Sequence, residues 1–164
     1  MSLDKAEKST GTRHKARECA LQMLFASDLV RDNDCPTLTR NYWNELGDQS
    51  IDDKTREFAN SLACGTLKEI VSIDDLIRTR AEHWRIERMA IVDRNVLRLA
   101  VYEFLYTDTP NGVAINEALE TARRFSSFEA TQFINGILDG IKHDLVAAAD
   151  EKPPASSRSH ASSN

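Results

Sequence analysis

The spacing of apolar residues between Val113 and Ile141 constrains the fold more than any other feature of the chain. In the first half of this segment these residues recur one, three and four positions apart, which places them on one face of a helix. They are Ala114, Ile115, Ala118, Leu119, Ala122 and Phe125. The second half shows the same spacing at Ile134, Ile137, Leu138, Ile141 and Leu145. The segment therefore predicts two amphipathic helices, each with one buried face.

Four residues, Ser126-Ser127-Phe128-Glu129, separate the two predicted helices. The Ser126 hydroxyl can accept a hydrogen bond from the amide three residues later, and the Glu129 side chain can reach back. This pattern predicts a capping box that opens the second helix at Ser126.

The rest of the chain predicts an all-α fold. The sequence has 164 residues with only 6 glycines and 4 prolines, which argues against many short strands. Further helices are expected over residues 12 to 28–31, 38–46, 51–80 and 88–106. We expect a flexible leader at 1–11, one helical domain at 12–148 with subdomains at about 12–81 and 84–148, and a disordered Ser- and Pro-rich tail at 149–164.

The helix expected over residues 88–106 is the most apolar, so we predict that it lies at the centre of the fold. Its charged residues Asp93, Arg94, Arg98 and Glu103 should occupy the one remaining edge. Arg94 and Arg98 form a like-charged i,i+4 pair, which is unfavourable unless acidic residues face it. In the 51–80 helix, Gly65 predicts a close crossing with another helix, since glycine is otherwise a poor helix former.

Charge and cysteine content limit the class of protein. The net charge of −5 means that any anion-binding surface must be a local patch. The 3 cysteines lack CxxC spacing, so free thiols are favoured over a disulfide or a metal site. The 4 histidines show no metal-ligand spacing. The lack of an apolar leader or membrane-length apolar run favours the cytoplasm and no membrane contact.

No catalytic motif is found in the sequence. GxGxxG, P-loop, GxSxG and HExxH patterns are all missing. Cys19 is a poor nucleophile candidate because the adjacent Glu18 would raise its pKa. Scarcity of glycine argues against a nucleotide cofactor. We therefore expect a binding protein without a cofactor or metal, and not an enzyme.

The first turn of the first predicted helix carries Arg13, His14, Lys15 and Arg17, with no acid before Glu18. A helix N-terminus has partial positive charge and exposed amides, so added cations suit it to bind phosphate. A solubilising charge run is the commoner meaning of such a cluster, and this reading stays open.

Aromatic residues and a second basic pair extend this pattern. Phe25, Phe128 and Phe133 lie at helix edges, and Arg123 and Arg124 precede the break. Cations that meet phosphates, with aromatic rings that stack on unpaired bases, are typical of single-stranded RNA binding. Each aromatic taken alone is more often a core residue. Phe133 is the best exception because it lies beside the apolar face of its helix.

Three motifs in the same order resemble the NusB family of bacterial transcription antitermination factors. They are Lys15 to Phe25 (KARECALQMLF), Val96 to Glu103 (VLRLAVYE), and a final group made of Val113 to Ala118, Arg124-Phe125 and Phe133 to Leu138. The resemblance covers about residues 13–142. It implies an all-helical fold of two three-helix subdomains.

The resemblance also implies a function. Members of this family pair with ribosomal protein S10 (NusE) and bind the boxA element of ribosomal RNA operon leaders. With other Nus factors they load onto RNA polymerase and suppress premature termination. Carried over by motif, the RNA-binding residues are Arg13, His14, Lys15, Arg17, Phe25, Glu129, Gln132 and Phe133. The S10 surface would lie on the exposed side of the central helix and its neighbours.

Two departures from the family pattern affect the predicted RNA site. Thr12 and His14 dilute the usual arginine run, which could weaken RNA binding or make it depend on pH. Phe128 stands in a break that often holds glycine and acids. Two alternatives therefore remain: a NusB-fold protein-interaction module with weak or no specific RNA binding, and the RNA-binding domain of an rRNA methyltransferase. The second is disfavoured because no glycine-rich cofactor domain follows.

Overall fold

The computed structural model describes residues 2–151, with side chains from residue 11 onward, and this part of the chain contains helices and no strand. The elements are α1 (Ser2–Val30), α2 (Cys35–Glu45), α3 (Asp53–Lys68), α4 (Ile70–Arg80), the 3-10 helix η1 (Ile86–Arg88), α5 (Ile91–Tyr106), α6 (Asn111–Phe125) and α7 (Phe128–Asp150). The predicted all-α fold is confirmed. Among the described helices, none combines the length and apolar character needed to cross a membrane.

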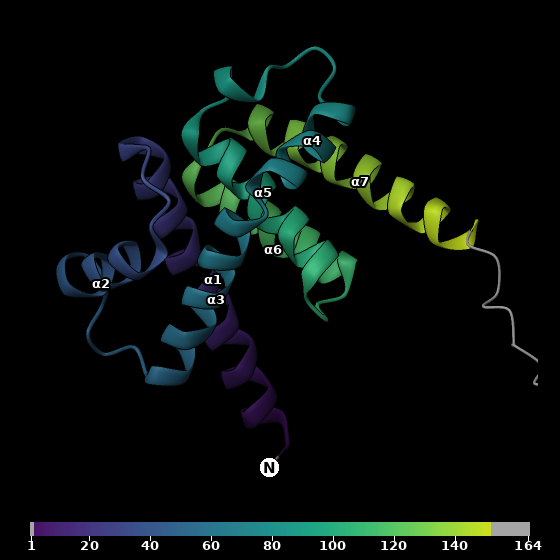
Figure 1. Ribbon diagram of the computed structural model, residues 1–164. Coiled ribbons are helices and arrows are strands. Elements are labelled where there is room, and N and C mark those ends of the chain that lie inside the picture. Colours follow the sequence, from purple (N-terminus) through teal and green to yellow (C-terminus); the bar gives the residue numbers. More distant parts are fainter. Residues whose placement is uncertain (1, 152–164) are drawn as a thin grey trace, which may run out of the picture.

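Helix α5 lies at the centre of the fold, as its composition predicts. It packs against α1, α3, α4, α6 and α7, which surround it in Figure 1. The prediction for its charged residues is wrong at two positions, since Arg98 and Glu103 are buried and do not lie on a free edge. Arg98 is buried against Asp74 of α4, and Glu103 is buried against Arg17 of α1. These partners are distant in sequence, so only the tertiary structure reveals them.

Two apolar clusters form the core. The first joins α1, α2 and α3, with Met23, Leu24 and Leu62 among its fully buried side chains. The second joins α4, α5, α6 and α7. Ile73 and Ile77 of α4 belong to this second cluster. Leu21 of α1 also belongs to the second cluster and Leu99 of α5 to the first, so the two clusters share helices and the subdomain boundary near residues 81–84 stays a prediction.

The prediction of a single helix over residues 51–80 is wrong, because Glu69 separates α3 from α4 with φ −102° and ψ 16°. The apolar spacing continues through this point, which conceals the break. However, Leu62 and Ala63 face the first cluster, whereas Ile73 and Ile77 face the second. A change of helix direction lets each half bury its apolar face in its own cluster.

The chain ends also differ from expectation. Helix α1 begins at Ser2, within the expected leader, and α7 continues to Asp150, within the expected tail. The segment before Gly11 contains Lys, Ala and Glu, which are good helix formers, and no proline. Met1 and residues 152–164 lie outside the described residues.

The break between α6 and α7 is confirmed, but its cap is one residue later than predicted. The Ser127 hydroxyl accepts the hydrogen bond from the Ala130 amide at 3.1 Å. Ser126 instead donates its hydroxyl to Asp93 at 2.5 Å. Phe125, which was expected in the buried face of α6, is 42% exposed because it is the last residue of that helix.

The prediction of three free thiols is wrong for two of them. Cys35 and Cys64 form a disulfide, with Cα atoms 5.7 Å apart and a sequence separation of 29. Sequence spacing reports only local pairs such as CxxC, whereas the fold places the first residue of α2 against α3. Cys19 is free and buried.

The predicted close approach at Gly65 is confirmed. A Cβ atom at this position would collide with the Tyr102 ring of α5, whereas a Cβ at Gly136 of α7 would meet no atom within 4 Å. The two glycines are both helical, so they form a matched pair for mutation.

We expect Gly65→Ala to destabilise the protein by about 1–3 kcal/mol, because the Tyr102 ring must move from a packed position. Gly136→Ala should instead stabilise it by roughly 0.5–1 kcal/mol through helix propensity. Urea denaturation of both variants measures the difference. Equal stabilities for the two variants would show that the helices can separate at Gly65 without cost.

Candidate nucleic-acid interface

The prediction that the basic residues occupy a helix N-terminus is wrong, because α1 begins at Ser2 and places them near its middle, away from the free amides of the first turn. These basic residues fall into two groups. Arg13 and Lys15 are exposed. The Arg13 guanidinium lies over the Phe58 ring, 5.5 Å from its centroid, and the Lys15 ammonium lies 3.7 Å from a Glu18 carboxylate oxygen. Both cations can therefore reach an external phosphate group.

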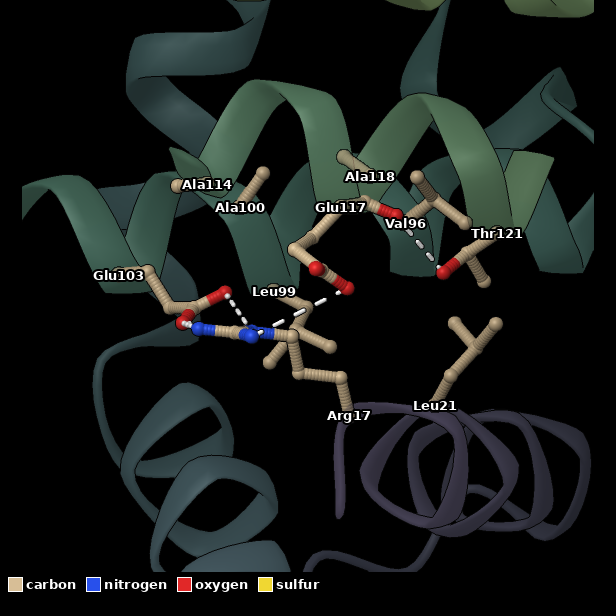
Figure 2. A pocket seen from close by; sticks show the side chains of 10 residues that line it. All are labelled: Arg17, Leu21, Val96, Leu99, Ala100, Glu103, Ala114, Glu117, Ala118 and Thr121. Carbon is tan, nitrogen blue, oxygen red and sulfur yellow. Dashed lines mark hydrogen bonds and ion pairs between the residues drawn. The ribbon is translucent and has the colours of Figure 1, made fainter. Parts of the chain in front are cut away.

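Arg17 belongs to the second group, because it is buried with only 4% of its surface exposed. Its Nε donates to Glu103 Oε1 at 3.0 Å and to Oε2 at 3.2 Å, and a terminal nitrogen donates to Oε1 at 2.9 Å. A Glu117 oxygen lies 3.9 Å from the same guanidinium. Figure 2 shows Arg17 reaching from α1 toward both carboxylates. The structure thus uses Arg17 to join α1 to α5 and α6.

The His14 side chain extends from α1 toward α6 and is surrounded by carboxylates. Its Nδ1 is 2.7 Å from Glu117 Oε2, and its Nε2 is 3.2 Å from Glu18 Oε1. The hydrogen bond with Glu117 is the largest cause of a raised imidazole pKa, and the charges of Glu117, Glu18 and Glu120 act in the same direction. Burial partly opposes them.

His14, Glu117 and Glu120 also place one ligand atom each within 4.8 Å of one another. Sequence spacing missed this group because His14 and Glu117 are 103 residues apart. Imidazole and carboxylate are ligands for several transition metals. However, Glu117 already pairs with His14 and approaches Arg17, so the same contacts are explained by ion pairing.

The other predicted residues lie at the far end of α1 and at the start of α7. Phe25 is 36% exposed, so it is more open than its place in the apolar pattern of α1 implied. Glu129 and Gln132 are exposed, and Phe133 is half-buried with its ring centroid 5.2 Å from that of Trp84. Glu129, Gln132 and Phe133 are three and four residues apart, so they share one side of α7.

Helix α6 connects the two groups of predicted residues. Glu117 in its first half contacts His14, and Arg124 in its last turn bonds to Glu18. The Ser126 hydroxyl, at the end of α6, donates to Asp93 near the start of α5, and α7 begins two residues later at Phe128. The basic residues of α1 and the predicted residues of α7 are thus linked through α6.

The structure adds exposed residues where α6 ends and α7 begins. Arg124 lies over the Phe125 ring at 5.0 Å, Arg123 is exposed, and Phe128 is 75% exposed. The sequence had indicated these residues through their basic and aromatic character. It gave no signal for Trp84, which is 61% exposed in the turn after α4. Cys19 remains an unsuitable nucleophile, since burial raises its thiol pKa and Glu18 contributes in the same direction.

These features define a class of protein: a fold that is helical throughout residues 2–151 and whose exposed cations and aromatic rings follow α1, α6 and the start of α7. A family model described as "NusB family" matches residues 14–143. The chain therefore belongs to the NusB family.

Individual relatives agree with this assignment. The chain is 48% identical over 144 residues to the transcription antitermination protein NusB of Koribacter versatilis, covering 87% of this chain and 97% of that protein. It is 42% identical to the NusB of Solibacter usitatus, covering 88% and 96%.

Solved structures share the fold. The NusB structure of T. maritima has a TM-score of 0.70 and 38% identity, covering 87% of this chain and 93% of that one. A chain in a crystal structure of antitermination factors NusB and NusE in complex with dsRNA has a TM-score of 0.69 and 25% identity, covering 81% and 97%. The predicted family and fold are confirmed.

The buried Arg17–Glu103 pair generates a stability prediction. Arg17→Ala leaves the Glu103 carboxylate buried without its partner and should lower the free energy of unfolding by about 3–5 kcal/mol. Arg13→Ala is the matched control, because Arg13 is exposed, and it should change stability by less than about 1 kcal/mol. Thermal and urea denaturation measure both. A loss of RNA binding in Arg17→Ala at full stability would contradict the structural role.

The carboxylates around His14 generate a pH prediction. Because the folded-state pKa is raised above the ordinary value of 6.5, protonated His14 stabilises the fold fully below pH 6.5. That contribution is lost as pH rises through the folded-state pKa. The difference in unfolding free energy between the wild type and His14→Gln should therefore shrink with increasing pH. A difference that stays constant from about pH 5.5 to about pH 9 would exclude this linkage.

Proposed function

We propose that this protein is a transcription antitermination factor that binds boxA RNA of ribosomal RNA operon leaders together with ribosomal protein S10 (NusE). With other Nus factors it suppresses premature termination by RNA polymerase in the cytoplasm. It acts by binding and not by catalysis. The observation that carries this proposal is the NusB match over residues 14–143, to a family with a relative crystallised with NusE and dsRNA.

The geometry supports specific roles for the predicted RNA-binding residues. Arg13 and Lys15 are exposed and would contact phosphates. Gln132, Phe133 and Phe25 would contact unpaired bases, and Glu129 would accept hydrogen bonds from base amino groups. Arg17 and His14 would act indirectly, since their contacts with Glu103 and Glu117 hold the basic part of α1 against α5 and α6.

The S10 surface would lie on the C-terminal helices. The central helix would contribute mainly its last turn, where Phe104 and Leu105 are partly exposed and Tyr106 is 46% exposed. The outer sides of neighbouring helices would therefore supply most of the contact.

We expect a boxA-type RNA to bind this protein, and to bind more tightly when S10 is present. About three phosphate contacts predict a log–log salt slope near −2, because each contact to single-stranded RNA contributes about −0.7. Arg13→Gln should reduce the magnitude of the slope by about 0.7. Arg17 cannot serve as a control position for this experiment, because a change at this buried residue should destabilise the fold. Fluorescence anisotropy at several salt concentrations measures the slope.

A protein-interaction module without specific RNA binding is the second candidate. It is favoured by the exposed apolar side chains of Leu29, Val30 and Leu46 on α1 and after α2, which are 62%, 67% and 69% exposed. Equal affinity for boxA and scrambled RNA in the presence of S10 would support this candidate and reject specific antitermination.

A further inference from the structure

A hollow on the surface lies between the C-terminal end of α4, the turn that follows, and α7. Trp84 and Arg80 line one side of it, and Gln132, Phe133 and Asp144 line the other. Two of these residues, Gln132 and Phe133, belong to the predicted RNA site. Trp84 has no role in any motif of the sequence.

The Trp84 indole is held in place but remains open to solvent. Its ring centroid is 5.2 Å from that of Phe133, and the two planes are inclined at 59°. Phe133 is half-buried and packs against the second core cluster, so it supports Trp84 from the protein side. The Trp84 amide also donates to the Ala81 carbonyl at 2.9 Å, which fixes the turn. With 61% of its surface exposed, the indole offers a free aromatic face.

The charges around the hollow indicate what kind of group it can accept. Arg80 donates its Nε to Asp144 at 2.7 Å, so its positive charge is neutralised within the pair. Glu82 adds a further negative charge to the lining, and His83 is its other titratable residue. The fixed charges of Arg80, Asp144 and Glu82 therefore leave an excess of one negative charge. A phosphate would be repelled here, whereas a neutral planar group would not. The Gln132 amide provides both a donor and an acceptor for the edge of such a group.

These properties fit a nucleobase better than a protein segment. A docked amphipathic helix needs several apolar contacts at i, i+3, i+4 and i+7. The rim of the hollow is polar and charged around one exposed ring, with Thr79, Arg80 and Glu82 beside Trp84. One aromatic face suits one stacked base.

We propose that this hollow is a nucleobase-binding subsite, in which an unpaired base of single-stranded RNA stacks on Trp84 with its edge at Gln132. The proposal rests on the proposed RNA-binding function and adds Trp84 as a residue that contacts RNA. The phosphates on either side of the base would lie outside the hollow, toward the exposed cations of α1 and α6.

Trp84→Ala should lower the affinity for a boxA-type RNA by about 5- to 150-fold, which corresponds to the roughly 1–3 kcal/mol of one base–aromatic stack. Trp84→Phe should retain most of the affinity, since it keeps an aromatic face. Tyr106→Ala is the matched control: Tyr106 is 46% exposed and contacts Glu69 at the opposite end of α4. In the absence of S10, the Tyr106→Ala variant should bind boxA-type RNA with the same affinity as the wild type.

Tryptophan fluorescence gives a second readout that does not depend on affinity. Trp43 is buried and donates its indole N–H to Asn60, so it should respond little to RNA. BoxA-type RNA should quench the tryptophan fluorescence of the wild type, and most of this quenching should be missing in Trp84→Phe. An abasic ribose-phosphate strand of the same length should bind weakly and leave Trp84 fluorescence unchanged.

The outcomes separate this subsite from the proposed function. Specific boxA binding with unchanged affinity in Trp84→Ala, and equal quenching by RNA and the abasic strand, would reject the subsite and leave the function intact. Loss of boxA preference in the wild type would reject the function itself. Quenching of Trp84 by S10 alone, with none by RNA, would show that the hollow binds protein and would overturn the proposal. If Trp84→Ala does not fold, the quenching comparison between wild type and Trp84→Phe decides.

Discussion

The ion pair between Arg17 and Glu103 holds the N-terminal helix against the centre of the molecule. Both side chains are nearly inaccessible, at 4% and 2% exposed, so each charge has lost its hydration. Three hydrogen bonds between them, with a further one from the Thr109 hydroxyl to Glu103 at 3.3 Å, compensate for that loss. The pair sets the rotation of α1, and this rotation directs Arg13 and Lys15 into solvent.

A second charged network fixes the C-terminal end of α1. Asp28 accepts hydrogen bonds from Arg94 at 2.6 Å and from Arg98 at 3.1 Å, and Arg98 also donates to Asp74 of α4. These acids remove the repulsion between two like charges one turn apart on α5. The Arg94 hydrogen bond also contributes to keeping the pKa of Asp28 below its usual value, although burial opposes it. Because Arg17, in the middle of α1, pairs near the end of α5, and Asp28, in the last turn of α1, pairs near the start of α5, the C-terminal half of α1 lies antiparallel to α5.

This rigid α1–α5 arrangement supports the proposed RNA site. Helix α6 lies along α1 through the Glu117–His14 and Arg124–Glu18 contacts, and it brings the chain to the start of α7. Cations are exposed along α1 and α6, and aromatic rings are exposed near the α6–α7 break. The proposed phosphate contacts therefore lie along α1 and α6, and the proposed base contacts lie where α6 ends and α7 begins. Trp84 would extend the base-contacting part beyond α7 to the turn after α4.

The sequence by itself determined the helical class, the central place of α5, the break before α7 and the family, because these depend on local spacing and on motifs. It also located the basic segment of α1, although not its place within the helix, and the exposed edge of α7. Tertiary structure alone decided which of these residues are accessible. Arg13 and Arg17 are both basic residues of one short segment, yet one is exposed and the other is buried against Glu103, 86 residues away. The Cys35–Cys64 disulfide, the turn of direction at Glu69 and the Trp84–Phe133 contact likewise join residues that no local pattern relates. Periodicity reports which face of a helix is buried, whereas the partner that meets this face is set by packing across the whole chain.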